Sequence, residues 1–117
     1  DREFHLAIAA ASGNAAVKYI IETLWKLRNE LPEVRDVHAA ICAVEDANER
    51  YSEHDEVLRA LRERDPSAAR EAMQAHFRGL LGSMIDVTEE QALEELRKKT
   101  SASRQRYLNS VASAQTS

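Results

Sequence analysis

Two histidines occupy mirror positions about a predicted helical turn. The turn is Asp65-Pro66; His54 lies 11 residues before Asp65, and His76 lies 11 residues after it. In an antiparallel helical hairpin, residues equidistant from the turn meet at the same height, here about 16 Å from the turn at a rise of about 1.5 Å per residue. Each histidine also lies on an apolar stripe of its helix. The spacing therefore predicts two imidazoles facing each other in one core.

A second pair of potential ligands opens the chain. Asp1 and His5 are four residues apart and so share one helix face, and His5 lies beside the apolar Ile8 on that face. Imidazole and carboxylate ligands suit Zn, Ni, Mn, Fe or Co. One aspartate and three histidines form a sensible ligand set for a divalent cation, with positions left open for water or a small ligand if five or six are used. The candidate ligands are Asp1, His5, His54 and His76.

The same residues also have ordinary interpretations. A histidine on an apolar stripe is more often a hydrogen-bonded core residue, and an aspartate at a helix start is more often a cap. Two facing core imidazoles without a metal would, however, need other partners. Spacing alone leaves both interpretations open. Three further residues receive structural roles only: His38 at the surface or boundary, Trp25 in packing or a dimer contact, and Cys42 as a small buried residue.

The helices that must position these residues follow from stripes and caps. Asn14 and Asp65-Pro66 are N-terminal helix signals, and Gly13 suits the left-handed position that ends a helix. Ser52 reads as a further N-cap, and Thr88 with Gln91 as a capping box. The predicted helices cover about 1–11, 14–31, 32–44, 52–64, 66–85 and from 89 onward into a frayed tail. The predicted fold is an all-α antiparallel bundle of about six helices.

Composition bounds the class of protein. The chain has 117 residues, 44% hydrophobic and 31% charged, with a net charge of −4, which fits one globular domain and not a basic nucleic-acid-binding surface. The single cysteine excludes an intrachain disulfide and fits a reducing cytoplasm. The sequence contains no apolar run long enough to span a membrane, and it contains no signal-peptide pattern. We therefore expect a cytoplasmic protein that does not bind membranes.

Three stretches together resemble a known family. They are Asp1-Arg2-Glu3-Phe4-His5 with Ile8 and Ser12-Gly13-Asn14; Glu53-His54-Asp55-Glu56-Val57-Leu58-Arg59-Ala60-Leu61; and Arg64-Asp65 with Ala69, Met73 and Ala75-His76-Phe77. Their order and spacing resemble the FCD domain, the C-terminal effector-binding domain of FadR-type regulators in the GntR family of bacterial transcription factors. The resemblance covers about residues 1–85. Each stretch alone is weak evidence for the family.

The resemblance implies a function. It implies an all-α bundle with Asp1, His5, His54 and His76 as ligands of a divalent transition metal, zinc first, nickel or manganese as alternatives. It also implies a neighbouring cavity for a small carboxylate effector, whose binding residues the sequence does not identify. The protein would be a homodimeric, non-enzymatic sensor that changes operator binding.

The chain departs from the full family pattern at its N-terminal side. The winged helix-turn-helix domain and the opening helices of the FCD bundle are expected but absent from this chain, so DNA would be bound only through the missing domain. Residues 1–85 are expected to form the metal- and effector-binding bundle, and residues 86–117 a C-terminal helix and frayed tail.

Two alternative functions stay open on sequence grounds. His54-Asp55 is an "HD" dipeptide of the kind that metal-dependent phosphohydrolases use, but Asp55 falls on the polar face of its helix with Arg59 and Arg62. The other alternative is a metal-free helical dimerisation module, in which the histidines are only packing residues.

Overall fold

A computed structural model describes residues 1–44 and 47–115 of the chain. These residues form five helices, and strands are not found among them: α1 (Arg2–Ala11), α2 (Ala15–Glu30), α3 (Pro32–Val44), α4 (Ala47–Arg62) and α5 (Pro66–Gln115). The contacts divide the chain into two compact units, Asp1–Met84 and Ile85–Ser117. The predicted all-α class is confirmed. The first unit contains the four candidate ligands.

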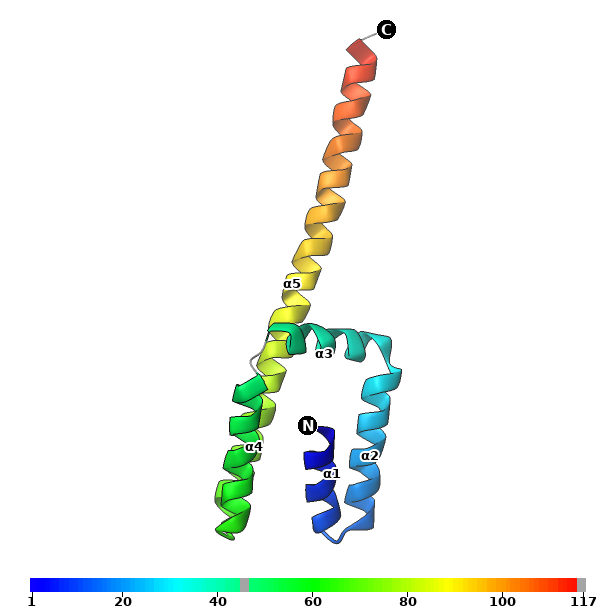
Figure 1. Cartoon of the computed structure of the whole chain (residues 1–117). Coiled ribbons are helices and arrows are strands. Elements are labelled where there is room, and N and C mark those ends of the chain that lie inside the picture. The colour runs from blue at the N-terminus through cyan, green and yellow to red at the C-terminus, as the bar shows by residue number, and fades with distance from the viewer. Residues whose placement is uncertain (45–46, 116–117) are drawn as a thin grey trace. The chain divides into compact units, whose positions relative to one another are not determined.

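The first helical hairpin joins α1 to α2 through a short turn, and the two helices lie side by side (Figure 1). Gly13 has a φ of 66°, the left-handed conformation that favours glycine, as predicted for this helix end. Asn14 caps α2, its side chain accepting hydrogen bonds from the backbone N–H groups of Ala16 and Val17. Helix α3 then leads from α2 toward α4 (Figure 1).

The second hairpin joins α4 to the first part of α5, around the predicted Asp65-Pro66 turn (Figure 1). The Asp65 carboxylate accepts hydrogen bonds from the N–H groups of Ser67 and Ala68, at 3.0 and 2.9 Å, so the predicted cap is confirmed. Arg64 has a φ of 57°, and the N–H of Asp65 donates to the Ala60 carbonyl at 3.0 Å, which satisfies the end of α4.

Two predicted boundaries are wrong. Ser52 does not begin a helix, because α4 already starts at Ala47. The capping-box pattern at Thr88 does not begin a sixth helix either, because α5 extends from Pro66 to Gln115. The segment that was expected to interrupt α5 contains neither proline nor glycine between residues 83 and 115, so no backbone constraint ends the helix there.

The core of the first unit is small and is formed by Ala9, Ile41, Val57 and Ala60, with His54 and His76 as its buried polar members. Buried imidazoles in so small a core require compensating contacts, since an unpartnered buried polar group costs roughly 1–3 kcal/mol. Among the described residues, no helix combines the length and apolar composition needed to cross a membrane.

Candidate metal centre

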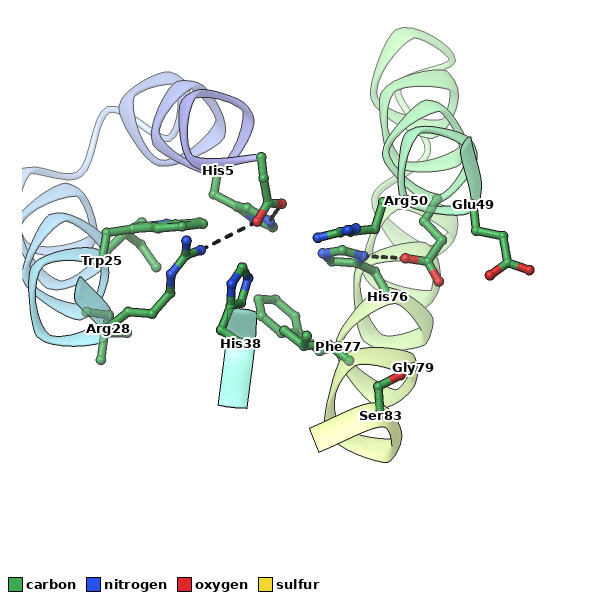
Figure 2. Close-up of a pocket in the computed structure, with 15 residues that line it drawn as sticks. His5, Trp25, Arg28, His38, Glu49, Arg50, His76, Phe77, Gly79 and Ser83 are labelled. Carbon is green, nitrogen blue, oxygen red and sulfur yellow. Dashed lines mark hydrogen bonds and ion pairs between the residues drawn. The ribbon is translucent and has the colours of Figure 1, made fainter. Parts of the chain in front are cut away.

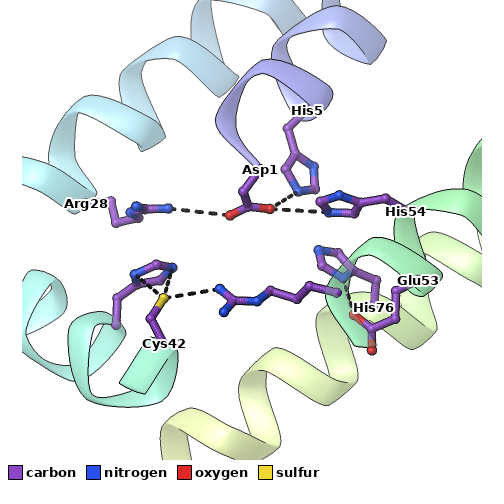
Figure 3. A network of polar contacts seen from close by, with 9 residues as sticks. Asp1, His5, Arg28, Cys42, Glu53, His54 and His76 are labelled. Carbon is purple, nitrogen blue, oxygen red and sulfur yellow. Dashed lines mark hydrogen bonds and ion pairs between the residues drawn. The ribbon is translucent and has the colours of Figure 1, made fainter. Parts of the chain in front are cut away.

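The four predicted ligands converge on one point. Asp1, His5, His54 and His76 each place one potential ligand atom within 4.8 Å of all the others (Figure 3). Their side chains come from the start of α1, the middle of α4 and the first third of α5. Ligands about 2.1 Å from a metal lie about 3.4 Å apart around a tetrahedral ion and about 4.2 Å apart where they face each other across an octahedral ion, so the widest pair would have to close by roughly 0.6–1.4 Å around an ion.

Asp1 is freed for this role by the way α1 begins. It occupies the N-cap position of α1, but its side chain makes no capping hydrogen bond. Its Oδ1 atom instead lies 3.4 Å from His5 Nε2 and 3.3 Å from His54 Nε2 (Figure 3). The predicted sharing of a face by Asp1 and His5 is therefore observed, and the carboxylate faces the imidazoles and not its own helix end.

The two hairpin histidines meet as the mirror positions predicted. The ring centroids of His54 and His76 are 4.8 Å apart, and the His5 ring lies 5.4 Å from His54 and 5.3 Å from His76. Phe4 stacks on the His54 ring with its centroid at 4.1 Å and fixes the ring plane. The stacked phenylalanine also excludes water from this side of His54.

One ring nitrogen in the cluster lacks a hydrogen bond. His54 Nε2 is buried, and among the described residues it has no hydrogen-bond partner, although it is near Asp1. Leaving a buried polar atom without a hydrogen bond is costly, so each such atom in a native structure needs an explanation, of which a bound ion is one. A cation held by these four residues would accept the lone pair of Nε2, so the residues present fit a metal.

The electrostatics favour neutral imidazoles. Burial, together with the neighbouring His76, His5 and N-terminal ammonium, lowers the pKa of His54 to about 4 against a smaller opposing effect of Glu53. Burial also lowers the pKa of His5, with the N-terminal ammonium acting in the same direction. A neutral imidazole keeps its lone pair for a metal, whereas a protonated one cannot bind it. Both rings are therefore ready to act as ligands at neutral pH.

A cavity of about 320 Å³ adjoins the cluster (Figure 2). Asp1, His5 and His76 belong to its wall, so the candidate metal position borders on it. Two guanidinium groups, those of Arg28 and Arg50, also line it. The remaining wall is mostly apolar or aromatic, with acidic and small polar side chains interspersed: Ile21, Leu24, Trp25, His38, Glu49, Glu53, Phe77, Gly79, Leu80 and Ser83.

Arg28 is held in place from two sides. Its guanidinium carbon lies 4.2 Å from the Trp25 ring centroid, a cation–π contact, and its Nη1 lies 3.7 Å from Asp1 Oδ2. Asp1 thus contacts the imidazoles through one oxygen and Arg28 through the other (Figure 3).

The sequence predicted the four residues that the structure brings together but missed most of the cavity wall. Trp25 was expected in packing or a dimer contact, yet it supports a cavity arginine; the three-residue spacing of Trp25 and Arg28 was the available signal. His38 lies outside the four-residue cluster, as expected, and also lines the cavity. Cys42 was expected to be buried and is exposed. Asp55 is exposed and is not part of the cluster.

The region that contains the cluster is similar to a known protein family. The model of the FCD domain matches residues 1–79, which include all four candidate ligands. The chain belongs to the FCD domain family. The resemblance predicted from the three stretches is thereby confirmed.

Curated relatives of this FCD chain are named as transcriptional regulators. The Exu regulon transcriptional regulator of Escherichia coli (strain K12) is 34% identical over 77 residues, which is 66% of this chain and 30% of the regulator. The Uxu operon transcriptional regulator of the same strain is 28% identical over 86 residues, 74% of this chain and 34% of the regulator. The chain thus spans about a third of the length of the curated relatives it matches. A search of solved structures gave no significant match.

Proposed function

We propose that this FCD chain is the effector-sensing domain of a GntR/FadR-type transcription regulator. It binds one divalent transition metal through Asp1, His5, His54 and His76, and a small carboxylate in the adjoining cavity. The observation that carries the proposal is the convergence of four ligand atoms within 4.8 Å at the edge of a cavity lined by two arginines.

The types of the four candidate ligands favour a first-row transition metal ion. Three imidazoles and one carboxylate match zinc, nickel and manganese better than the all-oxygen sets that magnesium and calcium prefer. We place zinc first. Four protein ligands around a five- or six-coordinate ion leave one or two positions for a carboxylate oxygen from the cavity.

The cavity suits a small anion. Its volume of about 320 Å³ lies at the low end of the range for small-molecule sites, roughly 300–1,000 Å³. Arginine recognises carboxylates through paired N–H donors, and the cation–π contact with Trp25 already orients the Arg28 guanidinium. A carboxylate held between the metal and Arg28 would meet positive charge on both sides. Arg50, from α4, supplies a second guanidinium on the wall.

The phosphohydrolase alternative has less support. That mechanism needs Asp55 beside the metal, but Asp55 is exposed and outside the cluster. The metal-free dimerisation alternative leaves the buried His54 Nε2 without a hydrogen bond. A binding function, and not an enzymatic one, also agrees with the names of the relatives, which are transcriptional regulators.

In the whole regulator, signalling would connect this domain to a separate DNA-binding domain. The relatives are about three times as long as the matched region, which leaves room for one. We propose that the regulator is a homodimer and that the effector acts by binding one arrangement of the dimer more tightly, since a ligand shifts an equilibrium only through such a difference.

The proposal is tested with tag-free protein and elemental analysis by mass spectrometry. We expect about one transition metal per wild-type chain after addition of zinc, nickel or manganese, and none in the His54→Ala/His76→Ala variant. Asp55→Ala is the matched control, because it changes a neighbouring exposed residue and should keep the metal. Small carboxylates should then raise the melting temperature of the zinc-loaded wild type. A wild type that takes up none of the three metals would refute the metal site.

A further inference from the structure

Glu53 makes a contact that the ligand set does not explain. Its Oε2 lies 2.6 Å from His76 Nδ1, and Figure 3 shows the two side chains joined by this contact. His76 is 4% exposed, so this is a short hydrogen bond to a buried ring. Glu53 precedes the candidate ligand His54 directly, yet it contacts a different helix.

This arrangement follows from helix geometry. Successive side chains on a helix diverge by about 100°, so Glu53 and His54 leave α4 in different directions. His54 turns toward Asp1 and Phe4, whereas Glu53 reaches across to α5. The two adjacent residues therefore contact different members of the cluster. His54 contacts Asp1 through Nε2, and Glu53 contacts the His76 ring.

The contact decides which nitrogen of His76 remains available. A carboxylate can only accept hydrogen bonds, so the hydrogen in this contact resides on Nδ1 of His76. In the neutral ring, Nε2 then keeps its lone pair. A histidine that binds metal through one nitrogen usually donates the other N–H to a carboxylate or carbonyl, which fixes the tautomer and the ring orientation.

Gly79 makes room for this carboxylate. A Cβ atom built on Gly79 would lie 3.3 Å from Glu53 Oε1, closer than most side-chain contacts, so any side chain at position 79 would push the carboxylate. Gly82, one turn further along α5, has nothing within 4 Å of an added Cβ. The two glycines lie on the same helix, but only at Gly79 would an added Cβ meet the Glu53 carboxylate.

We propose that Glu53 is the positioning residue of the metal centre, holding His76 in the tautomer and orientation that present Nε2 to the cation, with Gly79 as the space that admits its carboxylate. The proposal rests on the proposed metal site. Glu53 itself is outside the group of ligand atoms and acts through His76.

The first test measures zinc affinity of the 117-residue chain by competition with a chelator. Removing a partner of a ligating histidine typically weakens metal binding 10- to 100-fold, so we expect a loss of about this size in Glu53→Ala. Glu53→Gln keeps an oxygen that can accept the Nδ1 hydrogen and should recover part of the affinity. Gly79→Ala should weaken zinc binding, while Gly82→Ala, which gives the same gain in helix propensity, should leave it unchanged.

The second test needs no metal. In the metal-free chain above pH 7.5, ¹⁵N NMR of the imidazole rings distinguishes the two tautomers, and the His76 signals are assigned from a His76→Ala spectrum. We expect His76 to carry its hydrogen on Nδ1 in the wild type and in Glu53→Gln, and to lose this preference in Glu53→Ala. A change in folding stability alone would not alter the tautomer.

The outcomes separate this proposal from the proposed function. If the wild type binds zinc and Glu53→Ala binds it as tightly, the positioning role is refuted and the metal site stands. If His76 carries its hydrogen on Nε2 in the wild type, the positioning role is refuted as well. If the wild type binds no zinc, the proposed metal site fails and the positioning role fails with it. Graded zinc affinities in the order wild type, Glu53→Gln, Glu53→Ala, together with the Nδ1 tautomer, support the proposal.

Discussion

Replacing His54 with leucine should have opposite effects on stability with and without metal. In the metal-free chain, His54 is 8% exposed and its Nε2 has no hydrogen-bond partner among the described residues. A buried polar atom left in this state costs roughly 1–3 kcal/mol, which leucine avoids. Loss of the stacking contact with Phe4 offsets part of this gain, by about 0.5–1.5 kcal/mol. The net expectation is a metal-free variant at least as stable as the wild type.

Zinc should reverse this order. A ligand that binds only the folded state stabilises it by about 4.1 kcal/mol at a concentration of 1,000 times its dissociation constant. The wild type should gain this stability, and the leucine variant, which lacks one of four ligands, should gain little. For a domain of 60–100 residues, 1 kcal/mol corresponds to a change of about 4–8 °C in melting temperature, so the crossover is readily measured.

The assay is thermal unfolding followed by circular dichroism, with EDTA or with excess zinc. His38→Leu is the control, because His38 lines the cavity but is outside the four-residue cluster, and its variant should respond to zinc as the wild type does. If His54→Leu gains as much stability from zinc as the wild type, His54 is not a ligand. If it is several kcal/mol less stable than the wild type in EDTA, the argument from the unsatisfied nitrogen is wrong.

Three further outcomes follow from the structure. The unfolded chain binds more protons than the folded one between the lowered His54 pKa of about 4 and the ordinary value of 6.5, so metal-free stability should fall as the pH drops through this window; urea unfolding in EDTA checks this, and a flat profile would contradict it. Arg28→Ala should keep zinc binding but lose the thermal stabilisation by carboxylates, and equal stabilisation of both proteins would exclude Arg28 from the effector site. Asp65→Ala should lower the free energy of unfolding by about 1 kcal/mol in urea titrations, because two backbone N–H groups lose their acceptor; no change would show that the cap is dispensable.

Local signals predicted the helix ends that have a backbone cause. Gly13, Asn14 and Asp65-Pro66 each impose or satisfy a particular backbone geometry, and the structure has turns or caps at all of them. Ser52 and Thr88 were misread because a residue suited to capping does not end the preceding helix unless something there interrupts it. Capping is a local preference worth about 1 kcal/mol, and it is overridden where helix formation continues on both sides.

The convergence of the four candidate ligands was predictable because it depends on symmetry about one turn and on one helical repeat. The hairpin alone brings His54 beside His76, and a single helix turn brings Asp1 beside His5. The meeting of these two pairs depends on how the two hairpins pack. The Glu53 contact with His76 was not predictable in this way. Neighbouring side chains on a helix leave in different directions, and only the packing of α4 against α5 beside Gly79 brings the Glu53 carboxylate to the His76 ring.

Asp1 lies between the proposed metal site and the proposed carboxylate site. One carboxylate oxygen faces His5 and His54, and the other lies 3.7 Å from Arg28. A cation bound to the first oxygen would draw charge from the second and weaken its hold on Arg28, so the guanidinium would be more available to an anion in the cavity. Thermodynamic linkage then requires the carboxylate to raise metal affinity by the same factor. We therefore expect calorimetric titrations of zinc with and without a bound carboxylate, and of carboxylate with and without zinc, to give one common coupling factor above 1. A factor of 1 in both directions would mean that Asp1 does not link the two sites.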